Sequence, residues 1–430
     1  MVQSHILFAL ALCFGLTLEP QEPPKSDLPN PFSLKAEEFK AGNPLARFIE
    51  MVRMEKQYAA DAMWNSSYWQ ARSTLASQLG DIVEAEKSWS LGFQPGKHPL
   101  MVRSSLEGKT PMSAVEVIVK AADRHSWIMF GEEHVRPQTR SILPQLLREL
   151  RKKGFSVLAV ETLNEDLAAT TRQGYADYST GTYTADPVFA AGIREALRLG
   201  YKLVPYEHVE RPAEVPPGDI HFLQNFRESG QARKLKERIF DKDPKAKVIV
   251  WAGRAHVLET SVKDEQGEWT PMAYEFKRMT GIDPFSVYLS SYTEAIDRSR
   301  EWPLYKWATD RGLVTKPTIF MGKDGKAHGS SFDADVFFPR TSYIKGRPDW
   351  LVREMGRQPV DIPTGLVKGT GTQLVQAFGM GEPVTAVPVD QTLLRAGEAL
   401  PVLMLPSGRY SVRVIDAEGE ASELTPLTVR

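Results

Sequence analysis

The chain has 430 residues, of which 42% are hydrophobic and 25% are charged, and its formal net charge is −1. This is the composition of a globular protein that is long enough for more than one domain. Nucleic-acid binding and polybasic attachment to a membrane both need a clustered excess of Lys and Arg, which this charge balance does not support. We therefore expect a small-molecule or peptide substrate and no nucleic acid.

The chain starts with an apolar run, Ile6–Leu18, that is too short to span a bilayer comfortably. A cleavable signal peptide over residues 1–20 fits this run, and an uncleaved anchor or a misassigned start is the alternative. We expect a secreted or periplasmic protein with no integral membrane span after signal cleavage. Cys13 is the only cysteine, so the mature protein would have no thiol for disulfides, thiolate catalysis or Cys-ligated zinc.

Two segments separate this run from the main part of the chain. Residues 21–33 are rich in proline and polar residues, which is typical of a tether without a packed core. Residues 34–105 carry apolar and aromatic residues at helical spacing, which predicts two or three helices packed on the main domain. Their aromatic residues are candidates for lining a cleft, although aromatic residues at this spacing more often belong to the core: Trp64, Tyr68, Trp69 and Trp89.

Helical and extended patterns alternate between residues 106 and 362. The expected pairs of helix and strand are Met112–Ala122 with Trp127–Phe130, Gln138–Lys153 with Ser156–Val160, Pro187–Leu199 with Lys202–Tyr206, Leu223–Phe240 with Lys247–Trp251, and Trp269–Thr280 with Phe285–Leu289. Helices of this length between strands favour right-handed crossovers and parallel pairing. The sequence therefore predicts an α/β domain with a largely parallel sheet sandwiched by helices.

The end of the chain has a different pattern. Beyond Tyr292, a hairpin around Asp324-Gly325 and a strand over Asp335–Phe338 are expected to complete the α/β domain. Residues 363–430 consist of short alternating runs broken by Gly and Pro. This pattern predicts a small β-sandwich module, to which we assign no catalysis.

Titratable residues follow four successive strands of the predicted sheet. These strand ends read Gly131-Glu-Glu-His134, Glu161, Glu207-His208, and Gly253-Arg-Ala-His256. Open α/β sheets bind ligands just beyond the carboxyl ends of their strands, and buried charges destabilise a core unless they are paired. We therefore expect one polar cluster at this edge of the sheet, formed by Glu132, His134, Glu161 and His256.

Single members of this set also suit simpler structural roles. Glu161 is placed to cap the next helix, Glu133 to face water, and His208 to bond a loop carbonyl. Four Gly-x-x-His segments occur in the chain, and the two that end at His221 and His328 have no strand before them. The strand context thus separates two candidate segments from two chance matches.

Two mechanisms suit these residue types. His134, His256 and one of Glu132 or Glu161 would form a ligand set for zinc or a similar divalent metal, whose bound water is the nucleophile. Without a metal, His134 would act as the base, Glu161 would orient it, and His256 would steady the intermediate or protonate the leaving group. Arg227 or Arg254 would neutralise the developing oxyanion, and plain salt bridging is the alternative role for both.

Four segments together resemble a known superfamily. Gly131–His134, Ala159–Glu161, Arg227–Ala232 and Trp251–His256 are similar to segments of the erythromycin esterases, the ChaN-type haem-uptake proteins and the TraB/Tiki metalloproteases, over about Ser113–Ser290. The resemblance implies a site formed by two Gly-x-x-His segments and an intervening Glu, with an Arg-Asp helix segment between them. Where that segment has Asp and Met, this chain has Glu228 and Gln231.

The resemblance implies hydrolysis in most branches and haem carriage in one. We expect a hydrolase acting on an ester or amide, with His134, His256, Glu132, Glu161 and Arg227 as its site residues. The alternatives are a ChaN-type uptake protein that binds haem or another ligand in the same cleft without catalysis, and a scaffold whose C-terminal module binds a partner. No nucleotide cofactor is expected, because neither a Gly-x-x-x-x-Gly-Lys-Ser/Thr loop nor a Gly-x-Gly-x-x-Gly turn is present.

Overall fold

A computed structural model describes residues 26–93, 106–216, 221–264, 267–368 and 371–430. The predicted signal peptide and the first residues of the predicted tether lie outside this part of the chain. Within the described ranges, none of the helices is both long and apolar enough to cross a membrane.

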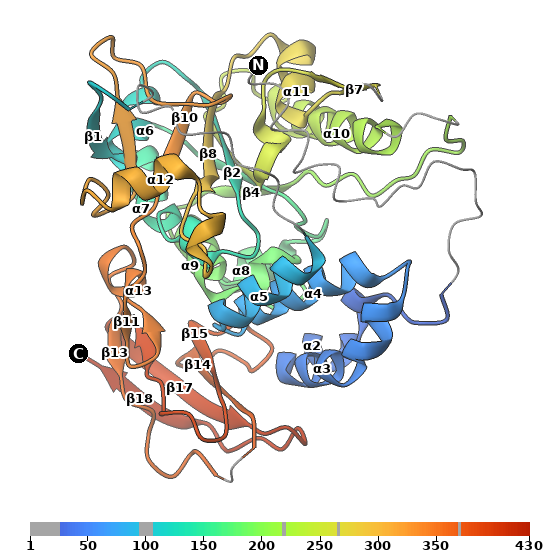
Figure 1. Cartoon of the computed structure of the whole chain (residues 1–430), viewed down its shortest axis with the longest axis vertical. Coiled ribbons are helices and arrows are strands. Elements are labelled where there is room, and N and C mark those ends of the chain that lie inside the picture. Colours follow the sequence, from blue (N-terminus) through green and yellow to red (C-terminus); the bar gives the residue numbers. More distant parts are fainter. Residues whose placement is uncertain (1–25, 94–105, 217–220, 265–266, 369–370) are drawn as a thin grey trace.

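The main domain is built on an eight-stranded sheet with the strand order β1-β9-β10-β8-β2-β5-β3-β4 (Figure 1). The six strands from β10 to β4 in this order are each parallel to the next, whereas β9 is antiparallel to both β10 and β1. The predicted α/β class with a largely parallel sheet is therefore confirmed. The strand bounds are Thr110–Ser113 (β1), Trp127–Glu132 (β2), Val157–Val160 (β3), Lys202–Pro205 (β4), Val248–Gly253 (β5), Phe285–Tyr292 (β8), Thr318–Met321 (β9) and Ala334–Phe337 (β10).

Helices cover both faces of this sheet because the central strands are apolar on both faces. Alternate residues of a strand point to opposite faces, so Trp127 and Met129 of β2 pack in a different core cluster from Ile128 and Phe130. One face is covered by α10 and α11, and the other by α6, α7 and α9 (Figure 1). The helix bounds are Ala114–Ala121 (α6), Leu143–Lys152 (α7), Pro187–Arg198 (α9), Phe222–Leu235 (α10) and Met272–Thr280 (α11).

Several helix boundaries differ from the expected ones for local reasons. The predicted helix Gln138–Lys153 is divided into a 3-10 turn, Pro137–Arg140, and α7, which has a proline in its first turn, a position that Pro favours. The predicted helix Leu223–Phe240 is α10 followed by a π-helical turn, Lys236–Phe240.

Two further predicted helices begin later than expected, because strands take up their first residues. Met112 lies in the edge strand β1, and Trp269 ends a short hairpin formed by β6 (Val262–Asp264) and β7 (Gly267–Trp269).

The described part of the N-terminal segment, up to residue 93, contains four α-helices where two or three were predicted. Their bounds are Ala36–Lys40 (α2), Pro44–Ala60 (α3), Asn65–Gln78 (α4) and Ile82–Gly92 (α5), after a 3-10 turn at Pro31–Ser33. Tyr68 and Trp69 are buried in the same core cluster as residues of the main sheet. The N-terminal helices thus share a continuous core with the α/β domain.

The C-terminal module consists of two small antiparallel sheets, as the alternating pattern predicted. One has the order β15-β14-β17-β18, and the other pairs β13 with β16. Apolar residues of both sheets share one core cluster. The pairing begins in β13, a few residues before the predicted boundary at residue 363. The bounds are Gln358–Val360 (β13), Gln373–Gly379 (β14), Asp390–Leu394 (β15), Leu403–Leu405 (β16), Gly408–Ile415 (β17) and Thr425–Val429 (β18).

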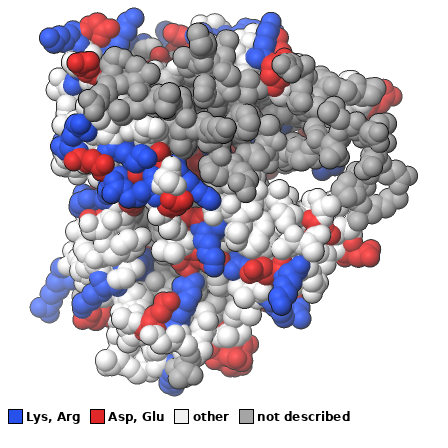
Figure 2. All heavy atoms as spheres, viewed as in Figure 1, with Lys and Arg blue, Asp and Glu red and all other residues white. Residues whose placement is uncertain are grey.

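Short elements connect these parts. They are α8 (Ala168–Gln173), α12 (Pro303–Thr309), the pair β11 (Tyr343–Ile344) and β12 (Arg347–Pro348), and α13 (Trp350–Arg353). On the face drawn in Figure 2, acidic side chains lie among the Lys and Arg side chains that are not covered by grey atoms.

Candidate active site

The carboxyl ends of β2, β5 and β3 lie side by side and bring the predicted site residues together. The register places Glu132 opposite Gly253, and Val160, the residue before Glu161, opposite Trp251. The Glu161 carboxylate then lies between two imidazoles. Its Oε2 is 3.7 Å from His134 Nε2, and its Oε1 is 3.6 Å from His256 Nε2.

The two glycines of the Gly-x-x-His segments are required by close approaches. A Cβ atom on Gly253 would lie 2.3 Å from His134 Nε2, and one on Gly131 would lie 2.1 Å from the carbonyl oxygen of Arg254. Because Gly253 has no side chain, the imidazole of His134 can pack directly against its backbone. Gly131 likewise leaves room for the 3-10 turn Arg254–Val257, which carries His256.

Glu132 is the carboxylate that holds His134. Its Oε1 is 2.8 Å from His134 Nδ1, and both of its oxygens accept hydrogen bonds from Arg140, each at 2.5 Å. Burial favours the neutral acid, but the Arg140 guanidinium outweighs burial and lowers the pKa of Glu132 to about 2. An ionised carboxylate only accepts, so the hydrogen of a neutral His134 sits on Nδ1 and the Nε2 lone pair lies on the side of Glu161.

This contact corrects one predicted role. We expected Glu161 to orient His134, and the structure assigns that contact to Glu132, which leaves Glu161 on the Nε2 side. A second contact fixes the plane of the imidazole, because the Tyr183 ring stacks on it with centroids 3.6 Å apart and an angle of 11° between the planes.

Glu228 holds the second histidine. Its Oε2 is 2.8 Å from His256 Nδ1, and it also accepts hydrogen bonds from the backbone N–H of Met272, at the start of α11, and from Gln224. Burial lowers the pKa of His256, but the carboxylates of Glu228 and Glu161 outweigh burial, and the pKa lies above its ordinary value. The two imidazoles thus have the same support at Nδ1, each from a buried carboxylate.

Arg227 connects the remaining groups of the cluster. Its guanidinium donates to Glu161 Oε1 at 2.7 Å and to both oxygens of Glu207 at 2.9 and 2.7 Å. It also lies 3.2 Å from His256 Nε2, which accepts this hydrogen bond when the imidazole is neutral. Gln231, one turn further along α10, donates to Glu207. The predicted Arg227 is therefore in direct contact with two other predicted site residues.

The remaining candidates lie at the rim or outside the cluster. Arg254 donates to Glu133 and lies over the Trp89 ring, 4.7 Å from its centroid. Trp89 therefore contacts the rim of the site, and α5 of the N-terminal segment contributes to this rim. His208 packs against the backbone of Gly230, where a Cβ would lie 2.2 Å from its ring, and within the described residues its Nδ1 makes no hydrogen bond, including none to the loop carbonyl expected for it.

The two chance matches to the Gly-x-x-His pattern lie in different surroundings. His221 is 3.0 Å from Asp264, and the buried His328 lies 3.4 Å from the Tyr292 hydroxyl. Burial lowers the pKa of His328 to about 4.

Several residues of this site were not expected from the sequence. Glu228 stands out as a departure from the superfamily pattern, and its position next to Arg227 on a helix was the available signal. The others carry no local signal because they come from loops and helices whose rotation the sequence does not fix. They are Arg140, Tyr183 and Asp186. Glu207 is among the strand-end residues but not among the predicted site residues.

The donor chemistry of His134, His256 and Glu161 suits zinc, and a zinc site formed by them stays a prediction. The described residues contain no group of three or more His, Cys, Asp or Glu arranged to hold a metal ion. The Arg227 guanidinium contacts both Glu161 and His256 Nε2, where a cation would bind. Haem binding also stays a prediction, and the two Nε2 atoms that would serve as axial ligands lie 3.7 and 3.6 Å from the Glu161 oxygens.

Comparisons with known proteins identify no family. No family model and no curated protein matches the chain. Among solved structures, the type III effector HopBA1 is 14% identical and has a TM-score of 0.30, with 46% of this chain and 95% of that chain covered. A bacterial protein toxin structure is 13% identical, with a TM-score of 0.32 and coverage of 58% and 56%. RRSP, a MARTX toxin effector domain from Vibrio vulnificus CMCP6, is 12% identical, with a TM-score of 0.29 and coverage of 58% and 55%.

These likenesses are too remote to establish a shared fold or function. The chain spans about half the length of the two toxin structures. The resemblance to the erythromycin esterase, ChaN and TraB/Tiki superfamily stays a prediction.

Proposed function

We propose that the protein is a hydrolase that cleaves an ester or an amide with two histidines and no metal ion. The observation that carries this proposal is that the Nε2 atoms of His134 and His256 lie 3.7 and 3.6 Å from the two oxygens of Glu161. A pure core would not retain so many ionisable groups, since buried charges are costly even when they are paired. Both imidazoles are within reach of solvent, with side-chain exposures of 17% and 13%.

The first chemical step is the activation of water by His134. A water that contacts His134 Nε2 would lie beside Glu161 Oε2, which is 3.7 Å from this nitrogen. Burial raises the pKa of Glu161, but the positive charges of His256, Arg227 and His134 outweigh burial and hold this pKa well below its ordinary range. Glu161 is therefore a poor base. His134 Nε2 therefore takes the proton as the water oxygen attacks the carbonyl carbon, and Glu132 stabilises the imidazolium that forms.

His256 and Arg227 serve the opposite side of the reaction. When His256 is protonated, its Nε2–H becomes a donor, which the raised pKa favours. The tetrahedral oxyanion would accept hydrogen bonds from Arg227. The bond to the leaving oxygen or nitrogen then breaks as that atom takes a proton from His256, and a carboxylic acid and an alcohol or amine are released.

The second candidate, a ChaN-type protein that binds haem, predicts different behaviour of the same residues. It requires a free imidazole Nε2 as an axial ligand, whereas His134 Nε2 faces Glu161, and His256 Nε2 faces both Glu161 and Arg227. We therefore give hydrolysis precedence, with small-molecule esters and short peptides as the substrate classes to screen.

The test is turnover by the purified protein on a panel of esters and peptides. We expect His134→Ala to lower kcat by about 10²–10⁴-fold, the range for removal of a general base, while overnight dialysis against EDTA leaves kcat unchanged. His125→Ala is the matched control, because His125 lies on the surface and contacts the Asp283 carbonyl. Activity that requires stoichiometric zinc would contradict the metal-free mechanism. A Soret band after incubation with haem, with no His134-dependent turnover, would favour the second candidate.

A further inference from the structure

One short segment carries two residues that act on His134 from opposite directions. We define it as the Thr182–Pro187 segment, which contains the 3-10 turn Tyr183–Ala185 and leads into α9. Tyr183 stacks on the imidazole of His134. Asp186 accepts a hydrogen bond from Arg140 at 2.6 Å, and Arg140 in turn binds the carboxylate that holds His134 Nδ1.

The Asp186 contact completes a buried chain of alternating charge. Arg140 donates Nε and one amino group to Glu132, and the other amino group to Asp186. It also donates to the carbonyl oxygen of His134 at 3.1 Å. Side chains of Arg140, Glu132 and Asp186 are each only 1% exposed. In such a buried network each partner fixes the geometry of the next, because an unpaired member would be costly.

The other side of the segment is held by the N-terminal helices and the C-terminal module. Gln78, at the end of α4, donates to the Thr182 carbonyl at 3.0 Å, and Arg357 lies 3.4 Å from the Pro187 carbonyl. Gln391 of β15 binds the Gln78 carbonyl at 2.8 Å and so links the two parts to each other.

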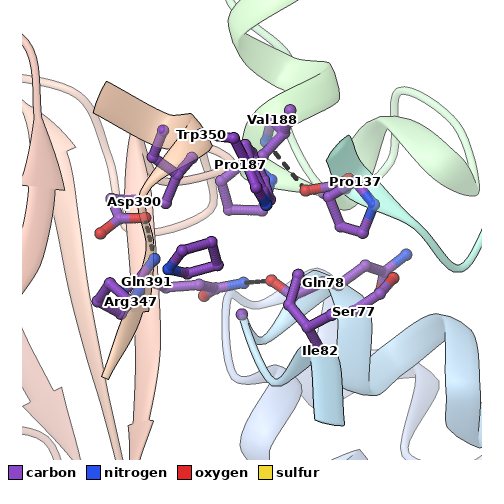
Figure 3. A pocket seen from close by; sticks show the side chains of 14 residues that line it. Ser77, Gln78, Ile82, Pro137, Pro187, Val188, Arg347, Trp350, Asp390 and Gln391 are labelled. Carbon is purple, nitrogen blue, oxygen red and sulfur yellow. Dashed lines mark hydrogen bonds and ion pairs between the residues drawn. The ribbon is translucent and has the colours of Figure 1, made fainter. Parts of the chain in front are cut away.

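These residues surround a cavity at the junction of the three parts of the chain. Its volume is about 20 Å³, enough for about one water molecule. Figure 3 shows Gln78 and Gln391 on one side of it and Pro187 and Val188 on another. Asp186 also lines this cavity, so the carboxylate that reaches Arg140 stands at the boundary between the α/β domain and the two accessory parts.

We propose that the Thr182–Pro187 segment positions His134, and that the N-terminal helices and the C-terminal module hold this segment in place. Asp186 and Tyr183 are then positioning residues, and the two accessory parts belong to the catalytic unit. This inference rests on the proposed function only for its effect on turnover, since the placement of the imidazole is a property of the free protein.

The placement has a spectroscopic signature that does not depend on activity. A ring proton held against the face of an aromatic ring is shielded, so the Hε1 resonance of His134 lies upfield. NMR spectra of the parent and its variants record the resonances of the eight histidines. The His134 resonance is identified as the one that is missing from the spectrum of His134→Asn. Tyr183→Leu removes the ring and defines the unstacked position, while Tyr183→Phe keeps the ring and the upfield shift.

Two variants test the positioning residues. Asp186→Asn keeps the shape and the N-cap acceptor but removes the charge that holds Arg140, and Gln78→Met removes the hydrogen bond to Thr182. We expect each to move the His134 signal toward its position in Tyr183→Leu. If the proposed function is also right, each lowers kcat by at least fivefold and changes KM by less than twofold, because the reacting group is displaced while substrate contacts remain.

Matched controls remove comparable buried contacts elsewhere. Glu301→Gln alters a buried carboxylate bound by Arg340, and Gln373→Met removes a buried hydrogen bond to the Lys368 carbonyl inside the C-terminal module. Neither contacts the Thr182–Pro187 segment, so both leave the His134 signal unchanged. The inference is overturned if Gln78→Met and Asp186→Asn, or the one of them that folds, keep the parent signal, or if the controls shift it equally. If the His134 signal moves in these variants while the parent protein shows no turnover, the positioning is supported and the proposed hydrolase function is refuted.

Discussion

Glu228, whose side chain has no solvent exposure, accepts a hydrogen bond from His256 Nδ1 at 2.8 Å. The pair explains why the pKa of His256 is raised even though the imidazole is largely buried, since burial alone would lower it. The raised pKa means that the folded protein binds the His256 proton more tightly than the unfolded chain does. The stability that this gives is fully present below the ordinary pKa of 6.5 and is lost as the pH rises through the folded value.

The first prediction concerns this pair. Glu228→Gln keeps the shape of the side chain and removes the charge that raises the pKa of His256, so that pKa falls. If protonated His256 is the acid of the reaction, the alkaline limb of the kcat profile moves to lower pH. The measurement is kcat between pH 5 and pH 10 for the parent and the variant. Gln224→Ala is the control, because it removes an uncharged partner of Glu228, and an alkaline limb at the parent position in Glu228→Gln would contradict the assigned role.

The second prediction uses the glycine of the second Gly-x-x-His segment. Gly253→Ala places a Cβ 2.3 Å from His134 Nε2, and the imidazole must move because the backbone of β5 is paired on both sides. We expect kcat to fall by at least tenfold while the melting temperature changes by only a few degrees, which activity assays and calorimetry would measure together. Gly371→Ala is the matched control, since a Cβ there meets nothing within 4 Å. Equal kcat values for the two variants would contradict the required approach.

The strand-end residues could be predicted because two local signals coincide in them. An apolar run that stops at Gly marks the carboxyl end of a buried strand, and the parallel order then places Glu132, His134, Glu161 and His256 at one edge. The contacts inside the cluster could not be predicted in the same way. Whether Glu132 or Glu161 reaches His134 Nδ1 depends on where the backbone leaves the strand, and no spacing rule fixes that direction.

Residues supplied by other elements were beyond the sequence for a related reason. Arg140 and Asp186 lie on segments that only tertiary packing brings to the sheet. The two residues bond each other although they are 46 positions apart in the sequence. The predicted helix Met112–Ala122 overlaps the end of the short edge strand β1, whose four residues show no alternation of burial that a sequence pattern could reflect. Tertiary pairing with β9, rather than local preference, makes it a strand.

The third prediction concerns acid stability. The pKa of Glu132 is about 2 in the folded protein, against an ordinary value of 4.5, so its ionised form stabilises the fold above pH 4.5 and this stabilisation is lost as the pH falls toward 2. Glu132→Gln removes it and leaves Arg140 with Asp186 alone, at a cost of about 3 kcal/mol for a broken buried ion pair. The free energies of unfolding of parent and variant are measured by urea unfolding at pH 7 and at pH 3. The difference in unfolding free energy between parent and variant should shrink at pH 3, and a difference independent of pH would contradict the ion pair.

The last prediction concerns Arg227. Its planar guanidinium reaches Glu161, both oxygens of Glu207 and His256 Nε2 at once. Arg227→Lys keeps the positive charge, but a lysine ammonium cannot make the parallel pair of hydrogen bonds to Glu207. If Arg227 stabilises the oxyanion, kcat falls by about 10²-fold in this variant, as it does when one preorganised donor is lost. KM should change little, because the carbonyl of the bound ester carries no full charge before attack.

Arg238→Lys provides the comparison for this effect. Arg238 follows α10 along the same helical stretch and pairs with Glu165 at the surface, away from the histidines. Its replacement should leave kcat within twofold of the parent value. If Arg227→Lys behaves like Arg238→Lys, the guanidinium acts as a structural partner of Glu207, and the oxyanion must be stabilised by His256 alone.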